Sequence, residues 1–211
     1  MKALVLAGGG AKGAYQMGVW KALRKLNIKF DIVTGTSIGA LNGALIVQDT
    51  YFRGIRLWRT TNFYKLFGPE LLEMKDLKKA IKFYSKNFVK QDGIDLDNYE
   101  KFVHRWLDVD KIYKSKIDFG VVTYNLSDRE PHFATKKKTK KDKLYDYVVA
   151  STSCFPAFDM KEIDGDKFID GGYYDNLPIN LAVDMGATEV IAVELDSLGI
   201  RRSVKKTTII S

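Results

Sequence analysis

The sequence contains a single cysteine, Cys154, and only two histidines, His104 and His132, among its 211 residues. A disulfide needs two cysteines, and structural zinc sites are built mainly from Cys and His. These shortages exclude a disulfide framework and a cysteine-rich zinc site, and they argue against a histidine-built metal centre. We therefore expect no metal and no other cofactor. A lone cysteine is also compatible with a reducing, cytoplasmic location.

Long hydrophobic runs are also missing from the sequence. No window reaches the roughly 18 consecutive apolar residues that span a bilayer. The apolar run within MKALVLAGGG, at the start of the chain, is shorter than the ~7–15 residues of a secretory signal core. The pattern therefore predicts neither a membrane-spanning helix nor a secretory signal.

Positive charge is concentrated rather than spread along the chain, whose net charge is +8. Residues 136–143, KKKTKKDK, contribute +5, and a C-terminal group of four contributes +4: Arg201, Arg202, Lys205 and Lys206. The remainder carries 8 − 5 − 4 = −1, so the body of the protein is nearly neutral. No module that reads nucleic acid is visible, and we expect no nucleic-acid partner. Peripheral contact with an anionic membrane and plain solvation both remain open for residues 136–143.

The order of apolar segments predicts the fold class. We expect short strands at 3–6, 31–33, 119–124, 131–135, 167–170, 189–194 and from 207 onward, and helices at 11–27, 38–48, 144–151 and 179–185. Short strands that alternate with helices favour an α/β fold with a mainly parallel central sheet. A chain of this length suits a single domain, over residues 1–211.

Two parts of the chain depart from this alternation. Residues 51–107 predict a helical insertion, and the aromatics and basic residues of 51–67 either pack into the core or form a lipid-facing flap. The chain ends inside the apolar run that begins at residue 207. This ending gives the hypothesis that the natural polypeptide continues beyond Ser211.

The motif Gly35-Thr36-Ser37-Ile38-Gly39 lies between a predicted strand and a predicted helix. A serine at such a sharp turn has an exposed hydroxyl, and flanking glycines allow neighbouring backbone to approach. The N-terminus of the following helix favours negative charge beside the serine. Ser37 is therefore a candidate nucleophile; the alternative is a tight turn with a serine cap.

A second glycine-rich turn, between the first strand and the first helix, consists of Gly8, Gly9, Gly10, Ala11, Lys12 and Gly13. It fits either a dinucleotide-binding loop or an oxyanion hole of backbone N–H groups. The dinucleotide interpretation requires an acidic residue at the end of the second strand. Asp31 instead lies at the start of that strand and not at its end, which weakens the alternative of a dinucleotide-binding oxidoreductase.

A nucleophilic serine needs a base. Both histidines precede the third glycine motif, Asp170-Gly171-Gly172, so they do not fit the order serine, acid, histidine of an α/β-hydrolase triad. We expect His104 to be half-buried on an amphipathic helix and His132 to lie on the surface. Asp170 is then the economical choice of base, because burial can raise the basicity of a carboxylate. The alternative is a turn-forming Asp-Gly pair.

Taken together, these motifs resemble the patatin-like phospholipases, which are serine lipid acyl hydrolases with a Ser-Asp dyad. The resemblance covers essentially the whole chain and includes a fourth match: Ala150 and Ser151, with Pro156 and Phe158 after them. It implies a three-layer α/β/α sandwich.

The resemblance also implies a role for each motif. Ser37 corresponds to the nucleophile and Asp170 to the base, framed by motif glycines: Gly35, Gly39, Gly171 and Gly172. Residues 8–13 correspond to the oxyanion hole. The implied function is hydrolysis of fatty acyl esters through an acyl-serine intermediate, with a lipid ester as substrate. A non-catalytic lipid- or anion-binding module on the same fold stays open as an alternative.

Overall fold

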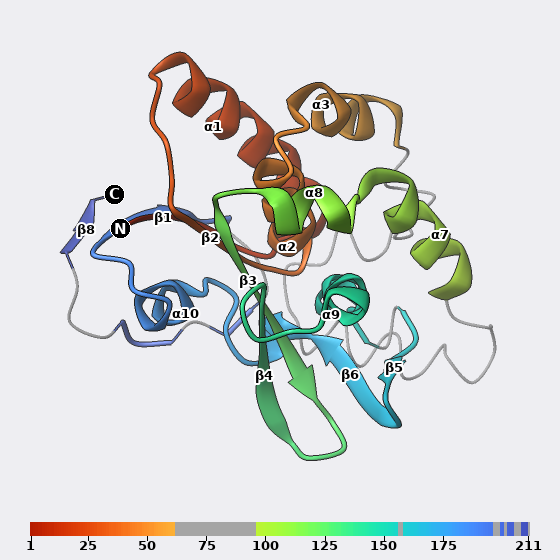
Figure 1. Ribbon diagram of the computed structural model, residues 1–211. Helices are drawn as coiled ribbons and strands as arrows, with labels where there is room; N and C mark the ends of the chain where they lie inside the picture. Colours follow the sequence, from red (N-terminus) through yellow and green to blue (C-terminus); the bar gives the residue numbers. More distant parts are fainter. Residues whose placement is uncertain (62–95, 156–157, 196–198, 201, 205–207, 211) are drawn as a thin grey trace.

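A computed structural model describes residues 1–61, 96–155, 158–195, 199–200, 202–204 and 208–210 (Figure 1). Its centre is an eight-stranded sheet in the order β5-β6-β3-β2-β1-β7-β8, with β4 also paired to β3. The strands are β1 (Lys2–Leu6), β2 (Ile32–Thr36), β3 (Asp118–Asn125), β4 (Glu130–Thr135), β5 (Lys161–Ile163), β6 (Asp166–Asp170), β7 (Glu189–Val193) and β8 (Thr208–Ile210). The predicted α/β fold is confirmed.

The sheet is mixed, and its two halves differ in strand direction. Strands β3, β2, β1, β7 and β8 are parallel neighbours. By contrast β4 and β6 run antiparallel to β3, and β5 runs antiparallel to β6. The antiparallel part includes β5, a three-residue strand that the sequence pattern did not predict, because so short a strand carries no clear alternation of apolar and polar residues.

Strands β2 and β6 share one edge of β3 and approach each other end to end. β2 runs parallel to β3 and ends with Thr36 opposite Val122. β6 runs the other way and ends with Asp170 opposite Thr123. The opposite edge of β3 is occupied by β4 over this stretch. Ser37, which follows Thr36, and Asp170, the last residue of β6, therefore lie at adjacent positions along β3.

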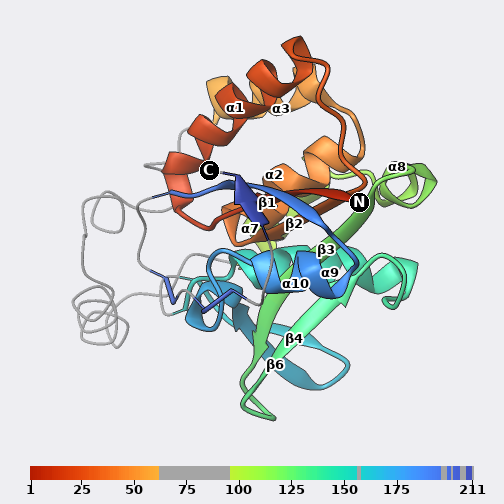
Figure 2. The ribbon, with the colours of Figure 1, turned by 90° about the vertical axis from the view of Figure 1, so that its left-hand side faces the viewer.

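Helices form a layer on each face of the sheet (Figures 1 and 2). One face packs against α1 (Ala14–Lys25), α2 (Ile38–Val47), α3 (Tyr51–Thr60), α7 (Leu96–Trp106), α8 (Val109–Lys114) and α9 (Lys141–Thr152). The other packs against α10 (Ile179–Asp184) beneath β1, β2 and β7. Short 3₁₀ helices η1 (Gly10–Gly13) and η2 (Gly171–Tyr173) follow β1 and β6.

Helix α2 is the centre of the core. Every residue from Ile38 to Val47 is buried, as the uncharged run 38–48 predicts. Of the predicted insertion over 51–107, the described parts are the two helices α3 and α7, together with the segments that border them. Residues 62–95 of it lie outside the described residues. No helix in the described part of the chain is long and apolar enough to cross a bilayer.

Candidate active site

Ser37 occupies a strained turn between β2 and α2. Its backbone has φ 55° and ψ −130°, a conformation that residues with a side chain rarely adopt. The two motif glycines make the turn possible. A methyl group on Gly35 would lie 2.7 Å from the backbone nitrogen of Ala40, and one on Gly39 would lie 2.7 Å from the carbonyl oxygen of Ala7. The first turn of α2 therefore crosses directly over the ends of β1 and β2.

The strained turn is tied to β3 by a buried serine. The backbone N–H of Ser37 donates to Ser151 Oγ at 2.9 Å, and the Ser151 hydroxyl donates to the carbonyl oxygen of Val122 at 2.7 Å. Ser151 is fully buried in the last turn of α9. A buried N–H without a partner is costly, so this two-bond bridge stabilises the position of the predicted nucleophile.

Asp170 lies beside Ser37 and is almost completely buried, with 5% of its surface exposed. Its backbone N–H donates to the carbonyl oxygen of Ser153 at 2.9 Å. One carboxylate oxygen accepts the N–H of Gly172 at 2.7 Å. Burial raises the pKa of Asp170 to about 6, although the nearby Ser37 side chain and the hydrogen bond from the Gly172 N–H lower it in part. The carboxylate therefore holds a proton more strongly than an ordinary aspartate.

The glycine-rich loop passes close to Ser37. A methyl group on Gly8 would lie 2.9 Å from the Ser37 Cβ and closer still to the Asn176 side chain. The Gly8 N–H donates to the Asn176 carbonyl, and the Lys12 N–H donates to the Gly9 carbonyl. Across the residues that the structure describes, no hydrogen bond uses the backbone N–H of Gly9, Gly10 or Ala11. These three donors remain available to a negative charge.

A buried amide network supports the loop from below. Asn42 on α2 donates to the Gly13 carbonyl at 3.0 Å and to Gln16 Oε1 at 2.8 Å. Gln16 in turn donates to the Ala7 carbonyl at 2.8 Å, and the Trp58 indole N–H donates to Asn42 Oδ1 at 2.9 Å. Asn42 is fully buried. The network therefore joins β1, α1, α2 and α3 around both ends of the loop.

Asn176 joins the loop to the segment after Asp170. It is buried, its Nδ2 donates to the Gly8 carbonyl at 3.3 Å, and its backbone N–H donates to the Ile200 carbonyl at 2.6 Å. Its Oδ1 would lie 3.0 Å from a methyl group on Gly172. Sequence reasoning missed both Asn176 and Asn42. The available signal for Asn176 was its place six residues after Asp170 in the same Gly-rich stretch.

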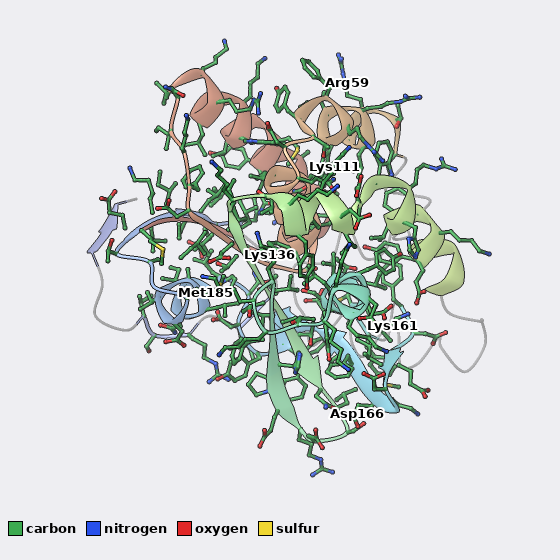
Figure 3. The ribbon with its side chains drawn as sticks, viewed as in Figure 1. Arg59, Lys111, Lys136, Lys161, Asp166 and Met185 are labelled. Atoms are coloured by element: carbon green, nitrogen blue, oxygen red, sulfur yellow. The ribbon has the colours of Figure 1, made fainter. Side chains whose placement is uncertain are left out.

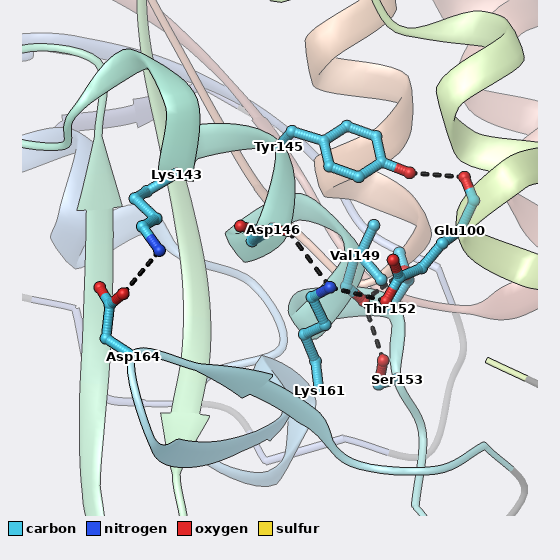
Figure 4. Close-up of polar contacts among 9 residues, drawn as sticks. All are labelled: Glu100, Lys143, Tyr145, Asp146, Val149, Thr152, Ser153, Lys161 and Asp164. Atoms are coloured by element: carbon cyan, nitrogen blue, oxygen red, sulfur yellow. Dashed lines mark hydrogen bonds and ion pairs between the residues drawn. The ribbon is translucent and has the colours of Figure 1, made fainter. Parts of the chain in front are cut away.

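An ion-pair cluster fixes α9, whose C-terminal end contacts Ser37 through Ser151 and Asp170 through Ser153, the residue after the helix. Lys161 Nζ lies 2.7 Å from a carboxylate oxygen of Glu100 on α7 and 3.2 Å from one of Asp146 on α9 (Figure 4). The Tyr145 hydroxyl donates to the Glu100 carbonyl. Lys161 is mostly buried, which strengthens these charge-assisted contacts relative to surface pairs. The cluster therefore joins α7, α9 and β5.

Both histidine predictions on burial are wrong. His104 is exposed on α7 and stacks on Tyr145, with ring centroids 3.7 Å apart. His132 is half-buried on β4, where its ring stacks on Tyr147, and burial lowers its pKa. An α9 ring covers each imidazole, and sequence alone does not reveal such pairing. His132 and Asp170 flank Thr123 on opposite sides in the sheet, which separates their backbones by two strand spacings, ~10 Å.

The lone cysteine sits near the base but is not a nucleophile. Burial and the neighbouring Asp170 carboxylate raise the pKa of the Cys154 thiol to about 12, so it stays protonated at neutral pH, and the thiolate is the reactive form. The described residues contain no cluster of three or more His, Cys, Asp or Glu side chains that could hold a metal ion.

Comparison with known proteins decides the family. The model of the patatin-like phospholipase family matches residues 4–183. The chain belongs to this family. The predicted resemblance is therefore confirmed, and the matched region of this patatin-like domain includes the glycine-rich loop, the Ser37 turn and Asp170.

Several relatives match nearly the whole patatin-like domain. Patatin-like phospholipase domain-containing protein 7 of Rattus norvegicus is 31% identical over 92% of this chain, and protein 6 of Homo sapiens is 32% identical over 92%. Lysophospholipase nte1 of Aspergillus terreus is 29% identical over 92%. The chain spans only 14%, 13% and 12% of these relatives, respectively.

A solved structure supports the fold. The crystal structure of VipD from Legionella pneumophila superposes with a TM-score of 0.59 over 84% of this chain and 47% of that chain. The sequence identity is 17%, so this likeness concerns the fold alone.

Of the fourth motif, Ala150, Ser151 and Phe158 are buried near the site, whereas Pro156 lies outside the described residues.

The bridge through Ser151 gives a stability prediction for this patatin-like domain. Ser151→Ala leaves the Ser37 N–H and the Val122 carbonyl without their shared partner, and we expect the free energy of unfolding to fall by ~1–3 kcal/mol. Ser153→Ala is the matched control, because that hydroxyl donates only to Val149 within its own helix, and its loss should be smaller. Urea unfolding followed by circular dichroism measures both; equal losses would contradict a structural role for the bridge.

Proposed function

We propose that this protein is a serine lipid acyl hydrolase of the phospholipase A or esterase type, with Ser37 as nucleophile and Asp170 as base. The observation that carries the proposal is the position of the Ser37 side chain beside the buried Asp170 carboxylate, close enough to lower the pKa of that carboxyl. A carboxylate with a pKa of about 6 accepts a proton more readily at neutral pH than one at its ordinary value of 3.8. Family membership supports the same assignment.

The first half of the reaction forms an acyl-enzyme. Ser37 Oγ attacks the ester carbonyl carbon while its proton moves to Asp170. The carbonyl oxygen becomes an oxyanion, and the N–H groups of Gly9, Gly10 and Ala11 are the donors that stabilise it. The C–O bond to the alcohol then breaks, and Asp170 returns the proton to the departing alkoxide.

The second half regenerates the enzyme. A water molecule attacks the acyl-Ser37 carbonyl and gives its proton to Asp170. Collapse of the second tetrahedral intermediate breaks the bond to Ser37 Oγ, which recovers that proton. The fatty acid leaves. In each half of the reaction, Asp170 first acts as a base and then, once protonated, as an acid, and it ends in its charged form. No step of this mechanism requires a metal.

Lysophospholipids are the substrate class we propose, because relatives at 29% identity carry the name lysophospholipase. The chain covers 12% of that relative, so a lysophospholipid and a diacyl phospholipid should be compared as substrates, and faster release of fatty acid from the lysophospholipid is expected. A non-catalytic lipid-binding module is the competing function, and it predicts an unreactive Ser37. The comparisons give no support to a dinucleotide-binding oxidoreductase.

A fluorophosphonate probe tests the dyad. We expect one adduct per chain, located on Ser37 by peptide mass spectrometry, and none in Ser37→Ala. Asp170→Asn should lower hydrolysis of a lysophospholipid by roughly a thousandfold, and the double variant should be little worse than either single one, because the two residues act as a unit. A well-folded protein without an adduct would favour the binding module.

The raised pKa of Asp170 predicts an acid limb in the pH profile. Protonated Asp170 cannot accept the serine proton, so kcat/KM should fall as pH drops through about 6. Burial also raises the pKa of Asp175 to about 6, which makes Asp175→Asn the necessary control. That variant should fold normally, because the Asp175 side chain accepts the backbone N–H of Leu177 and an amide oxygen can accept the same hydrogen bond. It should therefore keep the acid limb that Asp170 causes. A limb that disappears with Asp175→Asn would reassign the titrating group.

The proposal includes peripheral contact with an anionic membrane, and the described contacts argue against residues 136–143 as the contact surface. Lys136 Nζ donates to two backbone carbonyls, those of Ser115 and Ile117. Three more lysines of the run pair with carboxylates: Lys137 with Asp118, Lys141 with Asp110, and Lys143 with Asp164. Local partners therefore balance much of this charge.

Helix α3 is the better surface for membrane contact. Its outward side carries three arginines and no acid, and Phe52 beside them is 82% exposed. Arg59 lies at the outer end of the helix and points away from the sheet (Figure 3). Tyr51 and Trp58 pack on the core instead, as one of the two interpretations of 51–67 predicts. The lipid-facing role stays a proposal, and residues 62–67 lie outside the described residues. Its Trp58 end adjoins Gly13 of the glycine-rich loop.

A pair of matched variants tests which surface contacts lipid. The double variant Arg56→Gln, Arg59→Gln and the double variant Lys138→Gln, Lys140→Gln each take the net charge from +8 to +6. We expect the arginine variant to bind phosphatidylglycerol vesicles roughly 30-fold more weakly at low salt, at about 1 kcal/mol per charge, and the lysine variant to bind almost normally. Vesicle co-sedimentation at low and high salt measures both. Equal weakening would indicate attraction by net charge alone.

A further inference from the structure

The antiparallel part of the sheet has an apolar surface on the face that carries α10. Tyr124 on β3 lies opposite Pro131 on β4 and opposite Ile169 on β6. Side chains alternate along a strand, so these three residues share one face, and Asp170 points to the other. Helix α10 packs beneath β1, β2 and β7, which leaves this surface to be lined by loops.

A cavity of about 570 Å³ lies on this surface. Tyr124, Pro131 and Ile169 contribute to its floor, and the rings of Phe155, Tyr173 and Tyr174 contribute to its walls. The Tyr173 hydroxyl donates to the Phe155 carbonyl, which joins two of these walls. Cavities that bind small ligands have volumes of ~300–1,000 Å³ and mostly apolar linings. Size and lining therefore suit a hydrocarbon chain.

The charged residues that line the cavity are two arginines, Arg129 and Arg202, and no carboxylate lines it. Arg202 is held in place, because its Nε donates to the Tyr174 carbonyl at 3.0 Å and its guanidinium lies 4.0 Å from the centre of the Tyr174 ring. Among the described residues, no hydrogen bond or ion pair uses its two terminal nitrogens, and its charge lowers the pKa of the nearby Asp175 carboxyl. A positioned guanidinium with free donors matches a carboxylate, which it can bind through two hydrogen bonds.

We propose that this cavity binds a long-chain fatty acid anion, with the carboxylate on Arg202 and the chain along the apolar floor. Apolar burial provides the driving force for the chain, and the arginines provide the discrimination in favour of a negative head. The source of the ligand rests on the proposed hydrolysis, which releases a fatty acid, but the binding itself does not depend on catalysis.

The cavity and the dyad lie on opposite faces of the sheet. Ile169 and Asp170 are consecutive on β6, and one lines the cavity while the other meets Ser37. The floor of the cavity therefore faces away from Ser37, although Tyr173, one of its walls, lies near enough to Asp170 for that carboxylate to raise its pKa. Whether the cavity is separate from the acyl-chain site is decided by titration of protein blocked at Ser37.

Calorimetric titration of dodecanoate into the Ser37→Ala variant of this chain tests the proposal without turnover. We expect saturable binding at one site, weakened about tenfold or more by Arg202→Gln and little changed by Arg105→Gln, which removes the same charge from exposed α7. Dodecanol should bind the Ser37→Ala protein more weakly than dodecanoate and be insensitive to Arg202→Gln. Equal dodecanoate affinity in the two arginine variants would overturn the assignment.

A second titration separates the two sites. Active protein blocked at Ser37 with a short-chain fluorophosphonate should still bind dodecanoate as Ser37→Ala does. Loss of binding on blocking would place the ligand in the catalytic site and refute the cavity. If Ser37 proves unreactive, the titration into Ser37→Ala still decides the binding proposal, so failure of the proposed function and failure of this inference give different results.

Discussion

The candidate site depends on two strands that meet head to head along one edge of a third. Strands β2 and β6 run in opposite directions and end at adjacent positions on β3. Strand pairing alone therefore brings Ser37, which follows β2, close to Asp170, which ends β6. The carbonyl of Val122 lies at this junction. It accepts the Ser151 hydroxyl that holds the Ser37 turn, and it faces Gly171, where a side chain would collide with it.

Burial has two effects at this junction that oppose each other. It removes water from Asp170 and so raises the pKa of the carboxylate that the proposed chemistry needs as a base. It also requires every nearby backbone and amide group to find a partner. The Asn42 and Asn176 networks supply those partners on the two sides of the glycine-rich loop. Rigidity around the loop and basicity at Asp170 therefore have a common origin in the same dry environment.

The sequence predicted local features of the chain well, but it predicted contacts between distant segments poorly. The glycine positions around Ser37 and Asp170 marked both turns, because only a close backbone approach or a strained dihedral requires that spacing. The buried run 38–48 predicted α2, since an uncharged helix must be central. The antiparallel part of the sheet was not predicted, because strand direction is set by pairing partners distant in the chain. Histidine burial failed for the same reason: rings from α9 cover His104 and His132, and no local pattern records that contact.

The pairing of β1 has a consequence for how the chain reaches its native state. This strand is central in the sheet, yet its partner β7 is nearly at the far end of the described chain: Lys2 pairs with Glu189, and the N-terminal amino group itself bonds to Thr188, 187 positions away. The glycine-rich loop likewise takes its anchor from Asn176. Contacts of such long sequence separation form slowly. During synthesis the loop therefore stays without this anchor until residue 176 has left the ribosome.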